Sequence, residues 1–348
     1  MTTLYNRNWS RQELAPYVGH MDQVAGIKLL EAADGVERGN RILQVWTGSG
    51  LSFNVLADRA LDISACQYRG MSLTWRSAVG DIHPAYYDPA GAGFLRSFQG
   101  GMLVTCGLDQ IGPPSRDGDE ELGLHGRVSN LPAKSVSYHT SWAEDACELV
   151  ITGEVRQTRV FGENLVLRRR ISTLVGSNKI CIEDTVTNEG FNAYPHMIMY
   201  HVNAGFPLLS ENTRMKFAVE ATAPRDELAQ KGIADWMVFQ PPTPGYEEHV
   251  YVHTPVADDK GWANLELENP ALKLGLRLSF DKTNLPYLVE WKMMGEGLYV
   301  LGIEPANCNA SGGRAAVRKQ NMLPILEAGE SRSYALTLEV IEYPKEGG

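Results

Sequence analysis

A histidine and an asparagine close an apolar run in the segment 194–209, YPHMIMYHVNAGFPLL. Alternate side chains of an extended segment share one face, so His201 and Asn203 are expected to share the face of the two methionines before them. An imidazole titrates near neutral pH, which suits it to proton transfer. His201 is therefore either a hydrogen-bonded core histidine or an acid/base group at the edge of a sheet.

A carboxylate closes a second apolar strand, in the segment 298–309, LYVLGIEPANCN. Glu304 follows apolar or small residues on one face of this strand, and Pro305 ends it. A buried carboxylate is costly unless it is paired. Glu304 is therefore expected either to form a salt bridge, with Lys292 as one candidate partner, or to take part in proton transfer.

Other polar residues stand out against apolar surroundings. Arg59 lies in LADRALDIS, where it could bind a ligand or pair with Asp58 or Asp62. His125 lies between two glycines in LGLHGRVSN, so the backbone could come close to a ligand there. In YLVEWKMM, alternation places Lys292 on the face opposite Trp291.

The composition is that of an ordinary globular protein and excludes several classes. The 348 residues are 43% hydrophobic and 21% charged, and the formal net charge is −10. This acidic balance, with no block of basic residues, argues against a nucleic-acid binder. Five widely spaced cysteines without a CxxC motif favour reduced thiols. No secretion signal and no membrane-spanning run is recognisable, so we expect a cytoplasmic protein with no membrane partner.

Alternation of apolar and polar residues predicts an all-β protein. It is clearest at 51–55, 149–155, 272–280 and 334–340, and glycine-rich or proline-rich turn signals separate such rows. Short helices are expected at 10–17, where Ser10 and Glu13 have capping-box spacing, and at 225–231. We expect residues 1–348 to form one large antiparallel β-sandwich domain, with 1–20 as an N-terminal extension.

Several of these segments, taken together, resemble the aldose-1-epimerase (galactose mutarotase) superfamily. KICIEDTVTNEGFNAYPHMIMYHVNAGFPLL is similar to its strand, turn and histidine strand, LYVLGIEPANCN to its late glutamate strand, LGLHGRVSN to its second histidine segment, and RALDISACQYRGMSLTW to its early strands. The combination is closest to a bacterial branch of largely unassigned function. The resemblance runs from about residue 20 to 343 and implies a large β-sandwich, the mutarotase-like supersandwich, with a sugar site on one concave sheet.

The resemblance implies a cofactor-independent isomerase in carbohydrate metabolism. Opening a cyclic hemiacetal needs one group to remove the proton of the C1 hydroxyl and another to protonate the ring oxygen. We expect Glu304, ionised near a cation, to be the base and His201, partly protonated, to be the acid. The family usually has an aromatic residue soon after the catalytic histidine, in the pattern HxYFNL, whereas here Phe206 is displaced, so Asn203 could contact the substrate instead.

The remaining substrate contacts follow less directly. His125 matches the second, substrate-binding histidine of the family. Glu248 in YEEHVYVH is the best candidate for the family's hydroxyl-binding aspartate, with His253 nearby in sequence. Cationic side chains suggest that the monosaccharide could be a sugar acid, because a guanidinium matches a carboxylate. The cationic residues expected to bind a charged substituent of the sugar are Arg59, Arg76 and Lys292. Trp75 and Trp291 could stack on a sugar or belong to the core.

Two other functions remain open, and a homodimer is possible. A metal-dependent sugar isomerase could use His125, His201, His253, Glu248 and Glu304 as ligands, although no HxH or HExxH spacing occurs. A non-catalytic carbohydrate-binding module could have the same fold. The simultaneous presence of an imidazole and a carboxylate favours the enzyme.

Overall fold

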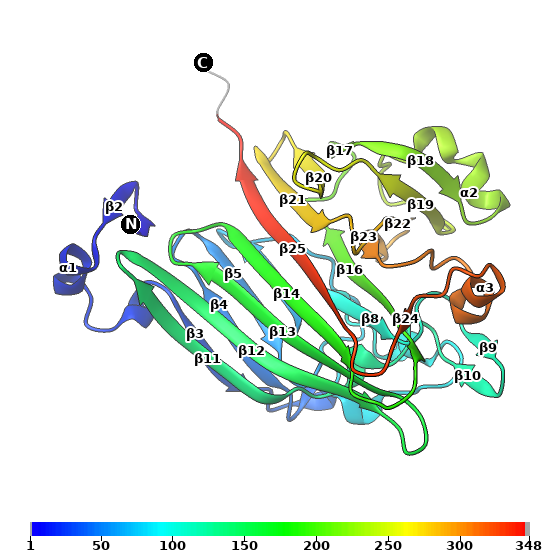
Figure 1. Ribbon diagram of the computed structural model, residues 1–348. Helices are drawn as coiled ribbons and strands as arrows, with labels where there is room; N and C mark the ends of the chain where they lie inside the picture. The colour runs from blue at the N-terminus through cyan, green and yellow to red at the C-terminus, as the bar shows by residue number, and fades with distance from the viewer. Residues whose placement is uncertain (1, 345–348) are drawn as a thin grey trace.

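Three antiparallel sheets contain most of the strands in the computed structural model, which describes residues 2–344 (Figure 1). The eight-stranded sheet has the order β11-β12-β13-β14-β25-β21-β20-β17, with bounds Lys134–Ala143, Ala146–Thr158, Asn164–Leu174, Lys179–Asn188, Ser331–Glu342, Leu274–Asp281, Trp262–Asn269 and Arg214–Phe217. The six-stranded sheet has the order β18-β19-β22-β23-β16-β8, with bounds Val219–Pro224, His249–Pro255, Tyr287–Met294, Tyr299–Ala306, Met197–Gly205 and Val104–Leu108. The five-stranded sheet has the order β3-β4-β5-β6-β7, with bounds Gly26–Glu31, Arg41–Trp46, Leu51–Leu56, Asp62–Tyr68 and Met71–Ser72. The predicted antiparallel β-sandwich is confirmed.

The remaining elements are short. Three two-stranded sheets pair β1 (Thr2–Leu4) with β2 (Arg7–Trp9), β9 (Ser115–Asp117) with β10 (Glu120–Leu122), and β15 (Tyr194–Pro195) with β24 (Ile325–Leu326). The α-helices are α1 (Arg11–Leu14), α2 (Glu227–Lys231) and α3 (Gly313–Lys319). Both predicted helices are confirmed, because Ser10 and Glu13 form the expected capping box and Asp226 caps α2.

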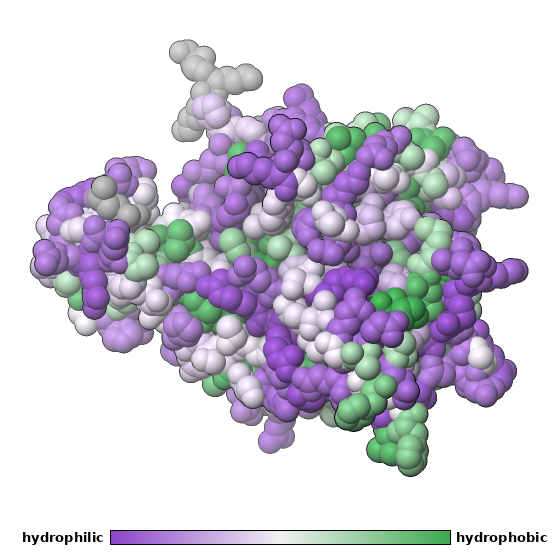
Figure 2. Space-filling view, in the orientation of Figure 1, coloured by the Kyte–Doolittle hydropathy of each residue, from purple (hydrophilic) through white to green (hydrophobic). Residues whose placement is uncertain are grey.

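The main core lies between the sheets. One cluster of buried apolar residues contains Leu43 and Phe53 of the five-stranded sheet, Leu167 and Leu336 of the eight-stranded sheet, and Ile303 of the six-stranded sheet. The outer face of the eight-stranded sheet instead carries polar side chains, and Figure 2 shows mainly hydrophilic residues over this sheet. The prediction of half-buried strands, made from the alternation, is therefore confirmed for this sheet.

The six-stranded sheet differs, because both faces of its inner strands are buried. Every residue of β16 and β23 is buried. One face belongs to the main core, whereas the other carries a second apolar cluster that includes Trp75, Phe94, Phe98 and Val317. Loops outside the sheet and α3 contribute these covering residues. A face that is covered only in part can hold a cavity.

A buried ionic network joins the sheets beneath this second cluster. The Arg169 guanidinium on β13 contacts Asp184 of β14 at 2.6 Å and Asp62 of β6 at 3.0 Å, and it donates to the Thr105 hydroxyl of β8 at 2.9 Å. Tyr200 of β16 donates to Asp184 at 2.8 Å. Burial alone would lower the pKa of Arg169, but the two aspartates outweigh it and raise the pKa. The network thus fixes strand β16 from below.

Candidate active site

A cavity of about 560 Å³ opens on the second face of the six-stranded sheet. Strands β16, β22 and β23 form its floor, and its walls come from the segments around Phe94, Gly112, His125 and Ala310. Its polar side chains are His125, His201, Arg225, Glu248, Glu304 and Ser311. This volume is in the usual range for a small-molecule site.

The imidazole and the carboxylate predicted from sequence meet on this floor. The register that pairs Met199 with Ala306 and Val202 with Ile303 places His201 opposite Glu304 on neighbouring strands. Their Nε2 and Oε1 atoms lie 3.1 Å apart, and both side chains are almost entirely buried. Two residues a hundred positions apart in the chain are therefore within proton-transfer distance.

Burial disfavours the charged form of both groups. It raises the pKa of Glu304 well above its usual range, and the Glu248 carboxylate raises it further. It lowers the pKa of His201 well below its usual range, and His125 adds to this effect. The 3.1 Å contact is within ion-pair distance, but among the described residues no donor is aligned in a hydrogen bond with Oε1 of Glu304. Burial therefore favours a neutral Glu304 beside a neutral His201.

This charge state differs from the one expected from the sequence. Lys292, the expected cation near Glu304, lies on the other face of β22 and donates to the carbonyl of Asp235 at 2.8 Å. Among the described residues, 2–344, no lysine lines the cavity beside Glu304. The pair is consequently controlled by desolvation rather than by a neighbouring cation.

His125 is the second histidine of the cavity, as predicted. It has a left-handed φ of 58°, which turns its ring to 5.8 Å from that of His201. Its Nδ1 accepts the backbone N–H of Gly112 at 3.3 Å, and burial lowers its pKa to about 4. A neutral ring whose Nδ1 accepts must carry its proton on Nε2. His125 therefore presents an N–H donor.

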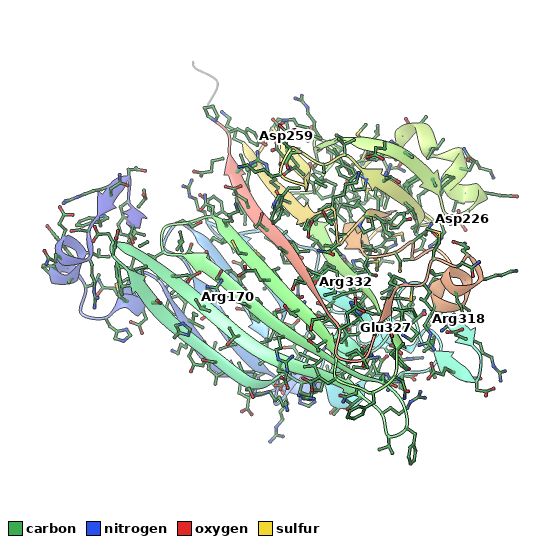
Figure 3. All side chains as sticks on the ribbon, viewed as in Figure 1. Arg170, Asp226, Asp259, Arg318, Glu327 and Arg332 are labelled. Atoms are coloured by element: carbon green, nitrogen blue, oxygen red, sulfur yellow. The ribbon has the colours of Figure 1, made fainter. Side chains whose placement is uncertain are left out.

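Glu248 also lines the cavity. It forms hydrogen bonds with two residues, and the sequence did not predict either contact. One oxygen accepts from the Trp291 indole at 2.7 Å, and the other accepts from Arg225 at 2.8 Å. Arg225 was missed, and its position at the start of the predicted helix at 225–231 gave no signal of a ligand site. Figure 3 shows its neighbour Asp226 at the start of α2.

Aromatic walls complete the site. The Phe98 ring lies 5.1 Å from the His201 ring and 6.1 Å from Trp291. Phe94 stacks on Phe98 at 5.3 Å. These two phenylalanines come from a loop without alternation, so the sequence offered no signal for them. Trp75 packs edge-on against Trp291 at 6.1 Å and belongs to the buried apolar cluster, whereas Trp291 faces the cavity.

Arg59 is not part of the cavity. Its side chain is fully buried, and its donors go to the carbonyl oxygens of Ser129, Ile82 and Ser97 and to the side chain of Gln99. Burial lowers its pKa to about 10. The prediction that Arg59 contacts the substrate is wrong. Its role is structural, because all these bonds hold loops to the five-stranded sheet.

Lys292 and His253 lie on the wrong face of the six-stranded sheet for the cavity. His253 is fully buried, contacts Glu290 at 3.0 Å and Thr222 at 2.9 Å, and packs on Trp236. Alternation along β19 and β22 turns both side chains toward the main core. The prediction that Lys292 and His253 contact the substrate is therefore wrong.

Asn203 and Arg76 also lie outside the cavity lining. The Asn203 amide donates to the carbonyls of Gly101 and His201 at 3.0 Å each, so it bonds β16, to which it belongs, to the segment at Gly101. Arg76 pairs with Asp81 at 2.7 Å. Neither side chain is placed to bind a ligand in the cavity.

Gly302 permits the approach of the central pair. A Cβ atom at this position would lie 3.0 Å from Cε1 of His201 and from Cβ of Trp291, and it would collide with Oε1 of Glu304. Any larger residue must therefore displace one of these side chains.

Within residues 2–344, no three His, Cys, Asp or Glu side chains converge in a metal-binding arrangement. Of the five ligands considered for a metal site, His253 lies on the opposite face of the sheet from the other four. These five residues do not form one coordination sphere.

None of the helices in the described part of the chain has the length and apolar character needed to cross a membrane.

The whole arrangement is similar to solved structures of one class. A candidate aldose 1-epimerase from Klebsiella pneumoniae shares 27% identity with a TM-score of 0.87, over 93% of this chain and 86% of that chain. A galactose mutarotase-like protein from Clostridium acetobutylicum shares 13% identity with a TM-score of 0.65, over 92% and 99% of the two chains. A galactose 1-epimerase from Lactobacillus acidophilus shares 11% identity with a TM-score of 0.60, over 92% and 100%. The chain therefore has the galactose mutarotase-like fold.

The family follows from a sequence model. The model described as "Domain of unknown function (DUF4432)" matches residues 37–340, so the chain belongs to this family. Among curated proteins, no sequence matches the chain.

Proposed function

We propose that the protein is an aldose 1-epimerase-like isomerase that interconverts the anomers of a sugar. The observation that carries this proposal is the 3.1 Å contact between His201 and Glu304 on the floor of a cavity of ligand size. The similarity to a candidate aldose 1-epimerase at a TM-score of 0.87 supports the same class of reaction.

The proposed reaction needs only proton transfers. Glu304 accepts the proton of the C1 hydroxyl, His201 donates a proton to the ring oxygen, and the bond between C1 and that oxygen breaks. Rotation about the C1–C2 bond exposes the other face of the aldehyde, and the reversed transfers close the ring. Each acid/base group contributes about 10²–10⁴-fold to such a rate. His125 supplies an N–H donor to a substrate oxygen.

The burial of Glu304 and His201 favours their charge states in the open-chain complex. In the open-chain complex, Glu304 has gained a proton and His201 has lost one, which is the neutral pair that desolvation favours. In the ring-closed complex, the proton moves back across the 3.1 Å contact, and sugar hydroxyls that replace water solvate the carboxylate. The pair can thus serve both halves of the cycle.

His201→Asn tests the acid assignment. We expect the catalysed exchange rate, measured by two-dimensional exchange NMR on a panel of neutral and acidic sugars, to fall by about 10²-fold or more. An exchange rate near that of the unchanged protein would remove His201 from the reaction. Tight sugar binding by calorimetry without any exchange in the unchanged protein would favour the binding module instead.

Gly302→Ala tests the geometry of the pair. The added Cβ pushes Glu304 away from His201 and Trp291. Because a misplacement of about 1 Å can cost about 10²-fold, we expect the exchange rate to fall by roughly 10- to 100-fold while the thermal midpoint changes little. Gly19→Ala, where nothing lies within 4 Å of the added atom, is the matched control. Full activity of Gly302→Ala would contradict the close pairing.

A further inference from the structure

The one guanidinium of the cavity is already paired with carboxylates. Among the described residues, Arg225 is the one cation of the cavity lining, and it donates to Glu248 at 2.8 Å and to Asp226 at 2.9 Å. Glu248 in turn accepts from Trp291. Two carboxylates therefore contact one guanidinium, Glu248 within the cavity lining and Asp226 outside it, so Arg225 offers a ligand no unpaired positive charge. A sugar carboxylate would have to enter beside Glu248, and like charges repel at such distances.

The sequence had suggested a sugar acid because of three other cations. Arg59 is fully buried and bonded to carbonyl oxygens, Lys292 is on the far face of the sheet, and Arg76 is paired with Asp81. None of them lines the cavity. The grounds for an acidic substrate are thereby removed.

Much of the cavity lining beyond the central pair is apolar. Side chains of Phe94, Phe98, Leu124, Val250 and Val289 line the cavity, and none of them can form a hydrogen bond to a hydroxyl group. A buried hydroxyl without a partner costs free energy, whereas a methyl group gains from the same contact. The polar groups are few. His201 and Glu304 are assigned to the reacting atoms, and His125 is assigned to one substrate oxygen. A ligand with fewer hydroxyl groups therefore fits better.

From the charge balance and the apolar walls together, we infer that the substrate is a neutral deoxysugar, a 6-deoxyhexose whose methyl group lies against the apolar wall. This inference rests on the proposed function, because it assumes that the anomeric centre is free and lies at the pair of His201 and Glu304. It excludes sugar acids, and it ranks fully hydroxylated hexoses below their 6-deoxy forms.

Sets of sugars that differ only at C6 test the inference. One set is D-fucose, D-galactose and D-galacturonate, a second is 6-deoxy-D-glucose, D-glucose and D-glucuronate, and a third is L-rhamnose and L-mannose. Exchange NMR gives kcat/KM for each sugar. In the set that reacts fastest, we expect the methyl sugar to exceed the hydroxymethyl sugar by about 10-fold and any carboxylate by about 100-fold. A hydroxymethyl or carboxylate sugar that equals or exceeds its methyl counterpart would overturn the inference.

Glu248→Gln isolates the contribution of charge. The amide is nearly isosteric and can still accept from Trp291, but it leaves Arg225 with one carboxylate instead of two. We expect kcat/KM for the sugar acid, relative to the methyl sugar of its set, to rise about 10-fold. An unchanged ratio would show that the ion pair does not select against acids.

Calorimetry separates this inference from the proposed function. Binding of each set is measured to the Glu304→Gln variant, which keeps the shape of the cavity. Binding in the expected order without exchange in the unchanged protein would contradict the isomerase and support the substrate class. Exchange with a different order contradicts the substrate class and leaves the isomerase standing. Absence of both binding and exchange in every set would refute both.

Discussion

Glu304→Gln is expected to lower the catalysed anomer exchange by about 10³-fold, because a general base contributes about 10²–10⁴-fold and an amide cannot accept the proton. Gln has nearly the same size as Glu. Burial favours the neutral form of the Glu304 carboxyl, because it raises its pKa. The substitution therefore removes proton transfer without leaving an unpaired charge. Exchange NMR at saturating sugar measures the rate, and circular dichroism checks the fold.

Glu290→Gln is the matched control for this variant. Glu290 is another fully buried glutamate of the same sheet, on β22, but it faces away from the cavity and bonds to His253 at 3.0 Å. We expect its exchange rate to stay within about twofold of the unchanged protein. If Glu304→Gln kept its activity, or if Glu290→Gln lost as much, the assignment of the base would be wrong.

Arg169→Met is expected to have the largest effect on folding, a loss of about 3–5 kcal/mol in the free energy of unfolding. Arg169 is buried with Asp62 and Asp184, and its nitrogen atoms also donate to Thr105 and to the carbonyl of Ala60. Methionine fills much of the space but leaves both carboxylates without their cation. Denaturant unfolding followed by circular dichroism measures the change.

The neighbouring arginine offers a control of the same type. Arg170 lies on the outer face of β13, as Figure 3 shows, and pairs with Glu148 and Glu183 at the surface. Exposed pairs contribute about 1 kcal/mol or less, so Arg170→Met is expected to change stability by no more than that. Equal losses in the two variants would show that the buried network is not a main source of stability.

The network also has a consequence for the site. Thr105 and Tyr200 belong to it, and Tyr200 directly precedes His201 on β16. If Arg169→Met still folds, its exchange rate should fall as well, because the floor of the cavity loses its support. A folded variant with normal exchange would limit the network to stability.

Much of the fold follows from local sequence alone. Alternation located strands such as those at 272–280 and 334–340, since a half-buried strand exposes every second residue to water. The capping box of Ser10 and Glu13 located the first helix by the same kind of local bonding. His201 and Glu304 were found as polar residues that follow apolar runs, where a buried charge needs a reason. Neither residue ends its strand, because β16 continues to Gly205 and β23 runs through Pro305 to Ala306.

The tertiary structure alone decided which face of the six-stranded sheet holds the cavity. Alternation placed Lys292 and Trp291 on opposite faces correctly, but both faces are buried, so period-two reasoning could not say which one meets the ligand. The covering loops determine this, and they also bring in Arg225 and Phe98 from distant segments. Arg59 was misassigned for a related reason. A buried arginine looks the same in sequence whether its donors go to a ligand or to backbone carbonyls, and only the packing of other segments around it determines which.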